Sequence, residues 1–277
     1  MKLQTRSRFR PVAIFVKVIL AALFLAPFYI TLCYSVKTRE EITKTGLAFP
    51  TIFHLSNFTE AMEMANFFLA LKNSILTTVP AVIVLTLICT TASYIIARKN
   101  NRFYNAWYYL FLGTILIPFQ TLMLPLYVNL KKWHLINTLA GFSLTRIGFL
   151  IPFSILIMTG FVKTVPVEIE QAAQIDGAGR YRIFFMIVSP LLKPIIATAV
   201  ILNSLYLWND FQTAILILQK AAVRTLPLTQ FFFFSENSAQ LNLAFALFTL
   251  SMTPILLLYF VLQKYITEGL TIGAVKG

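Results

Sequence analysis

Long apolar runs separated by short basic segments are the dominant pattern along this chain of 277 residues. A helix needs about 20 apolar residues to cross the roughly 30 Å hydrocarbon core of a bilayer. Six runs reach this length, and we predict that each forms a transmembrane helix. Their approximate ranges are 12–36, 75–97, 106–128, 141–162, 195–217 and 243–262.

The composition supports the same interpretation. Hydrophobic residues make up 58% of the chain, charged residues make up 12%, and the mean hydropathy is +0.78. Soluble domains average about 25% charged residues, and a fold of this length could not bury so much apolar surface within itself. An ordinary soluble enzyme, a disordered chain and a collagen-like chain are therefore excluded. The predicted fold class is an all-α membrane protein with six transmembrane helices.

The chain has a net charge of +13, and the distribution of its basic residues between the two sides of the membrane predicts its orientation. In a soluble protein such a net charge would suggest nucleic acid, but here the basic residues lie mostly between apolar runs, so we expect no nucleic-acid partner. Cytoplasmic loops of membrane proteins are enriched in Lys and Arg. The side that holds both termini carries thirteen of them: Lys2, Arg6, Arg8, Arg10, Arg98, Lys99, Arg102, Lys163, Arg180, Arg182, Lys193, Lys264 and Lys276. The other side carries eight: Lys37, Arg39, Lys44, Lys72, Lys131, Lys132, Lys220 and Arg224.

This count predicts a multi-pass membrane protein with both termini in the cytoplasm. Residues 1–11 form a basic cytoplasmic N-terminus and residues 265–277 a cytoplasmic tail. Residues 37–74 form an outer loop rich in aromatic side chains, for which an amphipathic stretch lying on the membrane is one interpretation. Residues 163–194 form the long cytoplasmic loop.

The chain carries no signature of a catalytic centre. It has no G-x-x-x-x-G-K-[ST] phosphate loop, no HExxH zinc motif and no Ser-His-Asp set. His54 and His134 are isolated, and Cys33 and Cys89 lie in separate apolar runs rather than in a CxxC pair. We expect no enzyme activity, no metal and no cofactor in this chain, and small lipid-facing or core-facing roles for the two cysteines.

The cytoplasmic loop has the pattern of a helix, a turn and a second helix. Pro166 suits the first turn of a helix, and Glu168 and Glu170 complement the helix dipole there. Asp176 and Gly177 then predict the end of that helix and a turn.

The helical spacing of the loop predicts faces suited to packing. One face of the first helix collects Ile169, Ala172, Ala173 and Asp176, and its alanines would let a partner approach closely. The apolar side of the second helix collects Ile183, Phe184 and Ile187, and prolines at 190 and 194 end it before the fifth run. Docking into another protein is the interpretation that we favour, and a helix resting on lipid is the alternative.

The loop also resembles the EAA motif of ABC-importer membrane subunits, in which E-A-A is followed by three residues, G, nine residues, I, one residue and L-P. The matching positions here are Gln171-Ala172-Ala173, Gly177, Ile187 and Ser189-Pro190. Gln171 stands where the motif has Glu, and Ser189 stands where it has Leu. Glu170 lies next to Gln171 and offers the missing charge.

Other segments are similar to the second membrane subunit of maltose-type and multiple-sugar importers. They are Asn73-Ser74, Ile117-Pro118 with Leu124-Pro125-Leu126-Tyr127, Trp208-Asn209-Asp210-Phe211, Arg224-Thr225-Leu226-Pro227-Leu228, and the tail from Gly269 to Gly277. The resemblance runs from about residue 12 to the end and implies a type I importer permease fold. The type-1 transmembrane domain would cover residues 70–264, with a coupling helix in the cytoplasmic loop.

The resemblance further implies that the protein lies in a bacterial cytoplasmic membrane and works with a set of partners. These are a second, non-identical permease subunit that completes a heterodimer, two ATPase subunits that bind ATP and Mg, an extracytoplasmic sugar-binding protein, membrane lipid, and a sugar as substrate. The residues that would contact the ATPase are Glu168, Glu170, Gln171, Ala172, Ala173, Asp176, Gly177, Arg180, Ile187 and Pro190. A second contact would come from the tail, at Thr271, Gly273, Lys276 and Gly277.

Polar groups inside the apolar runs are candidates for the transport pathway, because they are costly in lipid. They include Gln120, Ser154, Asn203, Trp208, Asn209 and Asp210. The alternative is that they hold the helices together. Pro118 and Pro125 additionally predict a broken third helix, which is tolerated only against protein or a water-filled cavity.

Two other classes of protein have to be weighed against a sugar-importer permease. A secondary transporter or channel needs no docking loop and usually has coupling carboxylates within its helices, where this chain offers only Asp210. A membrane scaffold would not need polar residues inside the apolar runs.

Overall fold

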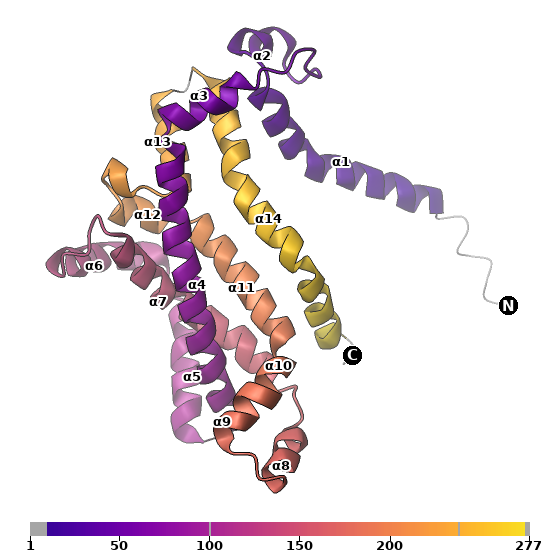
Figure 1. Ribbon diagram of the computed structural model, residues 1–277, viewed down its shortest axis with the longest axis vertical. Coiled ribbons are helices and arrows are strands. Elements are labelled where there is room, and N and C mark those ends of the chain that lie inside the picture. The colour runs from indigo at the N-terminus through magenta and orange to yellow at the C-terminus, as the bar shows by residue number, and fades with distance from the viewer. Residues whose placement is uncertain (1–9, 100, 238, 275–277) are drawn as a thin grey trace. The chain divides into compact units, whose positions relative to one another are not determined.

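The computed structural model describes residues 10–99, 101–237 and 239–274. Side chains are described from Ala13 to Val261 and at Gln263, with the same two gaps. Helices dominate this part of the chain, and no β-strand occurs in it (Figure 1). The predicted all-α fold class is therefore confirmed.

Four helices in the described part of the chain are long and apolar enough to cross a membrane. They correspond to the first, second, fourth and sixth predicted runs, and two of them, the second and the sixth, extend well beyond the predicted ends. They are α1 (Arg10–Ser35), α4 (Phe67–Arg98), α7 (Leu139–Val162) and α14 (Leu241–Ala274).

The third predicted run is a bent pair rather than one straight helix. α5 (Arg102–Ile115) and α6 (Phe119–Lys132) meet at an angle of 101°. Pro118 lies at the junction, where its fixed φ and missing N–H suit the start of a helix but not the middle of one. The predicted break is therefore present at Pro118, whereas Pro125 lies inside α6.

The fifth predicted run is also interrupted, which the sequence pattern did not predict. α11 (Lys193–Trp208) ends before Asn209, and α12 (Gln212–Ile217) begins after Phe211. A second bend, of 72°, separates α11 from the helical segment Arg180–Leu191 that precedes it. If each bent pair counts as one span, the described helices supply up to six spans.

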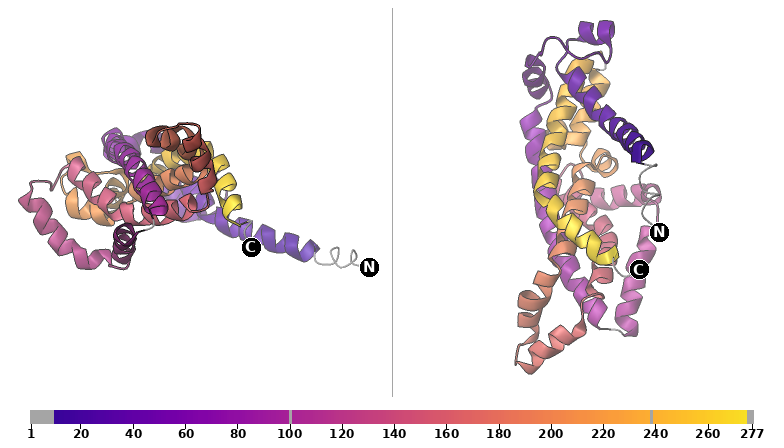
Figure 2. Two further views of the ribbon diagram at one scale, coloured as in Figure 1. Left: turned by 90° about the horizontal axis from the view of Figure 1, so that it is seen from below. Right: turned by 90° about the vertical axis from the view of Figure 1, so that its right-hand side faces the viewer.

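The chain divides into two compact units. Unit 1 comprises Met1–Phe67 and Gln230–Met252, and unit 2 comprises Phe68–Thr229 and Thr253–Gly277. Two views of the helices are given in Figure 2. Short elements complete the chain: α2 (Arg39–Thr45), α3 (Ser56–Met64), η2 (Ala221–Val223) and α13 (Leu226–Glu236).

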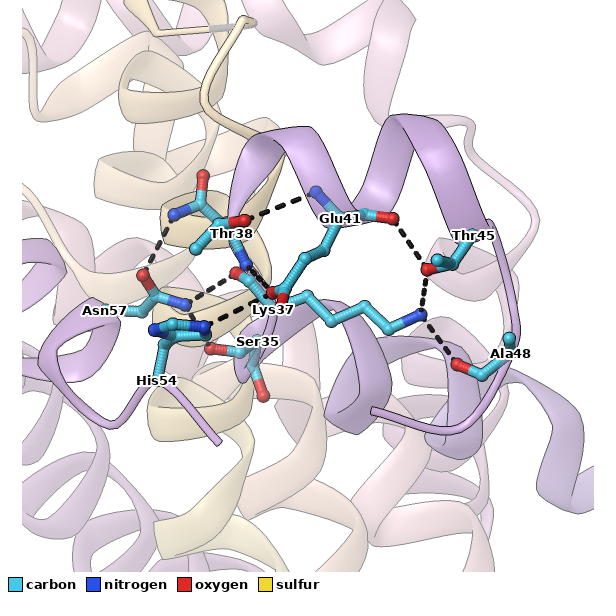
Figure 3. A network of polar contacts seen from close by, with 9 residues as sticks. Ser35, Lys37, Thr38, Glu41, Thr45, Ala48, His54 and Asn57 are labelled. Carbon is cyan, nitrogen blue, oxygen red and sulfur yellow. Dashed lines mark hydrogen bonds and ion pairs between the residues drawn. The ribbon is translucent and has the colours of Figure 1, made fainter. Parts of the chain in front are cut away.

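A buried lysine organises the segment between α1 and α3 in unit 1 (Figure 3). The Lys37 side chain is only 2% exposed, and its ammonium donates to the Thr45 hydroxyl and to the carbonyls of Gly46 and Ala48 at 2.6–3.0 Å. Three oxygens around one cation compensate the loss of its hydration. The cation therefore closes the turn that follows α2.

Asn57 joins the same region to two other segments. Its amide nitrogen donates to the carbonyls of Ser35 and Lys37, at 2.9 and 2.8 Å. Its amide oxygen accepts from Asn242 at 2.9 Å. Since Asn57 is only 5% exposed, these bonds fix the start of α3 against the end of α1 and the start of α14.

The core of unit 2 lies between α4, α7 and α11. Leu85 and Cys89 of α4 pack with Ile155 and Met158 of α7 and with Ala199 of α11, all of them buried. α5 covers this cluster through Tyr108 and Phe111. Cys89 and Cys33 are both free and buried, as predicted for small packing residues.

Two segments far apart in the sequence are bonded at the start of α4. The Asn73 amide donates to the carbonyls of Ala222 and Arg224 at 3.1 and 3.0 Å, and the backbone N–H of Leu226 donates to the Ser74 hydroxyl at 2.8 Å. Asn73 and Ser74 are both buried. These bonds fix residues 222–226 to the first turns of α4.

Candidate functional site

The first helix of the loop at residues 163–194, α8 (Val167–Ile175), begins and ends where the sequence predicts. Glu168 and Glu170 occupy its first turn, after Pro166. At its other end Gly177 has φ +79°, a conformation that glycine adopts without strain. The N–H of Ala178 donates to the Ala173 carbonyl at 2.9 Å, which closes the helix.

The two adjacent alanines of α8 do not share a face, which corrects the expectation. Ala172 is exposed, whereas Ala173 is buried against Val165, Ile183 and Val188. Successive residues in a helix are rotated by about 100°, so neighbours in sequence cannot both point outward from one narrow face.

The outward face of α8 carries two apolar side chains. Ile169 is 40% exposed and Ile175 is 87% exposed. Ala172 lies between them, and the exposed carboxylates Glu168 and Asp176 flank them. An apolar strip on a short hydrophilic loop is typical of a protein–protein contact.

Glu170 has a position different from the one expected for a residue that contacts a partner. It is 5% exposed, and its two carboxylate oxygens face α4. One accepts from Arg98 Nε at 2.6 Å and the other from the Tyr94 hydroxyl at 2.7 Å. Arg98 also donates to the Val165 carbonyl at 2.9 Å. Glu170 therefore fastens α8 to the end of α4.

The second half of the loop has an irregular helix that the sequence did not predict in detail. It consists of α9 (Arg180–Arg182), a π-helical segment η1 (Ile183–Val188) and α10 (Ser189–Leu191). Pro190 cannot donate to a preceding carbonyl, so the regular ladder is interrupted before it.

The predicted apolar side of this second helix is present. Ile183 and Phe184 are buried, and Ile187 is half-buried against the same cluster as Ala173. Arg180, Gln171 and Pro190, which were predicted to contact the ATPase, are exposed. Figure 1 shows α8 and α9 together at one end of unit 2.

The tail residues predicted as a second contact are only partly described. Thr271 and Gly273 belong to the last turns of α14, where the backbone alone is described. Lys276 and Gly277 lie outside the described residues.

The predicted pathway residues differ in burial and in hydrogen bonding. Ser154 of α7 and Asn203 of α11 are 0% and 1% exposed and bond to each other, with Asn203 Nδ2 donating to Ser154 Oγ at 2.9 Å. Trp208 is 7% exposed. Gln120, in the first turn of α6, and Asn209, directly after α11, are exposed.

Both carboxylate oxygens of Asp210, in the break between α11 and α12, have bonding partners. One carboxylate oxygen accepts from the backbone N–H groups of Thr213 and Ala214, both at 3.0 Å, and so caps α12. The other lies 3.0 Å from Arg146 Nη1 of α7 and accepts from the Thr213 hydroxyl. Arg146 also donates to the Tyr206 carbonyl at 3.2 Å.

Sequence reasoning missed both arginines that hold these carboxylates. Arg98 was counted as a topology signal only, and Arg146 was not singled out at all. Buried charges occur in pairs. An arginine at the end of an apolar run or inside one, with a carboxylate in another segment, was therefore the signal that could have predicted these ion pairs. Across the described ranges, no three His, Cys, Asp or Glu residues are placed to hold a metal ion.

Comparisons with known proteins point in one direction. Residues 89–272 match the family described as binding-protein-dependent transport system inner membrane component. The melibiose/raffinose/stachyose import permease protein MelC of Bacillus subtilis is 36% identical over 260 residues, covering 94% of each chain. The probable starch degradation products transport system permease protein AmyC of Thermoanaerobacterium thermosulfurigenes is 32% identical over 95% of each chain. The multiple sugar-binding transport system permease protein MsmG of Streptococcus mutans is 34% identical over 92% of each chain.

A solved structure shows the same fold. It is a chain from the crystal structure of a bacterial ABC transporter involved in the import of the acidic polysaccharide alginate. The TM-score is 0.81 at 20% sequence identity, and the match covers 96% of this chain and 99% of that one.

Proposed function

This chain belongs to the family of binding-protein-dependent transport system inner membrane components, and from that premise we propose that it is a permease subunit of an ABC importer for oligosaccharides. The relatives support this substrate class, because their names include melibiose, raffinose, stachyose, starch degradation products and diacetylchitobiose. A secondary transporter or channel is disfavoured by the family match.

The remaining components of the transporter belong to the same proposal. A non-identical permease completes the pathway, two ATPase subunits bind and hydrolyse ATP with Mg, and an extracytoplasmic binding protein delivers the sugar. In this arrangement the chain has no catalytic centre of its own. The excess of basic residues on the side of the cytoplasmic loop supports an orientation with that loop and both termini in the cytoplasm.

The geometry of α8 is the observation that carries the mechanism. One side of the helix is fastened to α4 through Glu170 and Arg98, and the opposite side exposes Ile169, Ala172 and Ile175. A partner that binds the exposed strip and then moves would therefore transmit its motion to α4 through the Glu170–Arg98 ion pair. Closure of the ATPase dimer on ATP would supply that motion and switch the pathway between inward and outward access.

The pathway itself is proposed to use the exposed polar groups rather than the buried ones. Gln120 and Asn209 are exposed, whereas Ser154 and Asn203 satisfy each other, and Asp210 is engaged by Arg146 and α12. We therefore assign the three engaged residues to holding helices together. Trp208 is 7% exposed and lines a cavity of about 330 Å³ whose other walls are mainly apolar, which offers few partners for the hydroxyls of a sugar.

Cross-linking tests the docking face with a matched pair of variants. Ala172→Cys places a thiol on the exposed strip, and Ala173→Cys places one in the buried cluster, one residue away. In the assembled transporter, Ala172→Cys should cross-link to the ATPase subunit in an ATP-dependent manner, and Ala173→Cys should not. Equal cross-linking of both variants, or of neither, in an active complex would contradict the assignment.

Transport is tested separately in proteoliposomes that contain the two permeases and the ATPase. Oligosaccharide uptake should require both ATP inside and the binding protein outside. Uptake driven by an ion gradient without ATP would favour the secondary-transporter alternative.

A further inference from the structure

A cavity of about 730 Å³ lies between the end of α4, α8 and the segment α9–η1. All of its lining residues belong to unit 2. On α8 the lining comes from Val167, Glu170, Gln171 and Gln174, which is not the face that carries Ala172 and Ile175. The cavity is therefore distinct from the proposed ATPase-docking strip, and it is lined by Gln171 and Arg180, two residues that the resemblance had assigned to the ATPase contact.

The charges of the cavity leave two cations without a carboxylate. Glu170 and Arg98 line it, but they neutralise each other. Lys99 lies 5.5 Å from the ring centroid of Tyr104, and in the described part of the chain no hydrogen bond or ion pair engages Arg180. Lys99 and Arg180 both line the cavity, so its net charge is positive.

The remaining walls are aromatic and amide in character. Tyr94 and Phe184 pack against each other, with ring centroids 5.0 Å apart. Tyr181 is 85% exposed and Phe185 is 62% exposed at the rim. Aromatic side chains at the end of a membrane-spanning helix mark the level of lipid headgroups.

We propose that this cavity binds the phosphate headgroup of one anionic phospholipid from the leaflet on its side of the membrane. Lys99 and Arg180 contact the phosphate, Gln171 and Gln174 bond the polar headgroup, and Phe185 lies along the acyl chains. Basic pockets between membrane helices recognise anionic lipids in this way. That this leaflet is the cytoplasmic one rests on the proposed function.

The location gives the lipid a consequence for transport. Glu170 and Arg98, which fasten α8 to α4, are both in the cavity wall. A bound headgroup would exclude water from this ion pair and so strengthen it, because a charge pair attracts more strongly in a drier environment. Uptake should therefore depend on the anionic lipid content of the membrane.

Native mass spectrometry of the purified, assembled transporter tests the proposal. Delipidated complex in mixed micelles is titrated with phosphatidylglycerol, with phosphatidylcholine as the neutral lipid and with inorganic phosphate. We expect one phosphatidylglycerol per copy of this chain, a clear preference over phosphatidylcholine, and no displacement by millimolar phosphate.

Charge-matched variants locate the site. Lys99→Gln with Arg180→Gln removes the two cavity cations and should weaken phosphatidylglycerol binding about 25-fold, since each cation near an anionic surface contributes a factor of about five. The control is Arg182→Gln with Lys193→Gln, two exposed residues of the same loop that do not line the cavity. The control should retain nearly full binding.

Several results would overturn the site. These are equal losses in both double variants, equal binding of the two lipids, competition by inorganic phosphate, and complete loss of phosphatidylglycerol when the ATPase subunits join, which would assign the cavity to a protein contact. Failure of the site is distinguishable from failure of the proposed function, because the ATP-dependent cross-link of Ala172→Cys to the ATPase subunit does not depend on bound lipid.

Discussion

Unit 2 contains two buried arginine–carboxylate pairs that are built in different ways. Glu170 takes its hydrogen bonds from side chains of another helix, Arg98 and Tyr94. Asp210 takes three of its bonds from its own neighbourhood, the backbone and hydroxyl of Thr213 and the backbone of Ala214, and only one from Arg146. The first carboxylate is therefore a link between elements, and the second is a local cap that also neutralises a distant cation.

The difference predicts different responses to substitution. At the Asp210 pair the buried arginine is the vulnerable partner, because its guanidinium lies inside the helix bundle, and its Nε atom has no hydrogen-bond partner among the described residues. At the Glu170 pair, the short helix α8 depends on the ion pair for its attachment to α4. Loss of the Asp210–Arg146 pair should affect stability, and loss of the Glu170–Arg98 pair should affect communication between helices.

The largest effect is expected for Asp210→Ala. It leaves the Arg146 charge uncompensated and removes the cap of α12, which should cost about 3–5 kcal/mol. The midpoint of thermal unfolding of the purified complex should fall accordingly. The double variant Arg146→Met with Asp210→Ala should recover part of the loss, because no lone charge remains. Additive losses in the double variant would show that the pair is not energetically coupled.

A smaller effect on stability, but a large one on uptake, is expected for Glu170→Gln. Replacing a charge-assisted bond should weaken the anchor of α8 by about 1.5–3 kcal/mol. Hydrogen exchange of the α8 amides should accelerate, and ATP-driven uptake should fall. Glu168→Gln is the matched control for the hydrogen-exchange measurement, since Glu168 is an exposed glutamate of the same turn. If both variants accelerate the exchange of the α8 amides equally, the anchor has no special role.

Gly177→Ala should have a milder effect on the same helix. A Cβ added at Gly177 would meet no other atom within 4 Å. The alanine variant should therefore lose only the stability that the strain of the positive φ costs, about 1–2 kcal/mol. Uptake should be reduced rather than abolished. Gly177→Asn should be closer to wild type, because Asn tolerates this conformation better than Ala. A fully active alanine variant would mean that the turn can relax without moving α8.

The smallest effect is expected at Glu41, a partly exposed carboxylate of unit 1. The backbone N–H of Thr38 donates to it at 2.7 Å and holds the pKa of Glu41 below its ordinary value of 4.5, with a further lowering from His54. A lowered pKa contributes stability that is complete above the ordinary value and is lost as the pH falls through the lowered value. Thermal unfolding should therefore distinguish wild type from Glu41→Gln at pH 7 and no longer do so at strongly acid pH.

The sequence predicted the helices better than the joints between them. Length and apolar composition located all six runs, and Pro118 predicted the break between α5 and α6. The break at residues 209–211 was not visible in the same way, because nothing in the apolar pattern shows that Asp210 caps a new helix rather than continuing the old one.

The candidate site shows the same limit at the level of single side chains. Periodicity placed α8 and its turn correctly, but it could not determine which side of the helix faces α4. Ala173 and Glu170 were predicted to face a partner, and the structure buries both, because the partner of Glu170 lies 72 positions away along the chain at Arg98. Contacts between distant segments depend on tertiary packing that a single sequence does not reveal.

The bonds between the start of α4 and residues 222–226 have a consequence for biogenesis. Asn73 and Ser74 meet partners 149–152 residues later in the chain. At synthesis rates of about 5–20 residues per second, those partners emerge roughly 8–30 s after α4 begins to enter the membrane. During that interval the two polar side chains have no native partner, so the membrane-insertion machinery, or a chaperone at this stage, must shelter an unfinished helix.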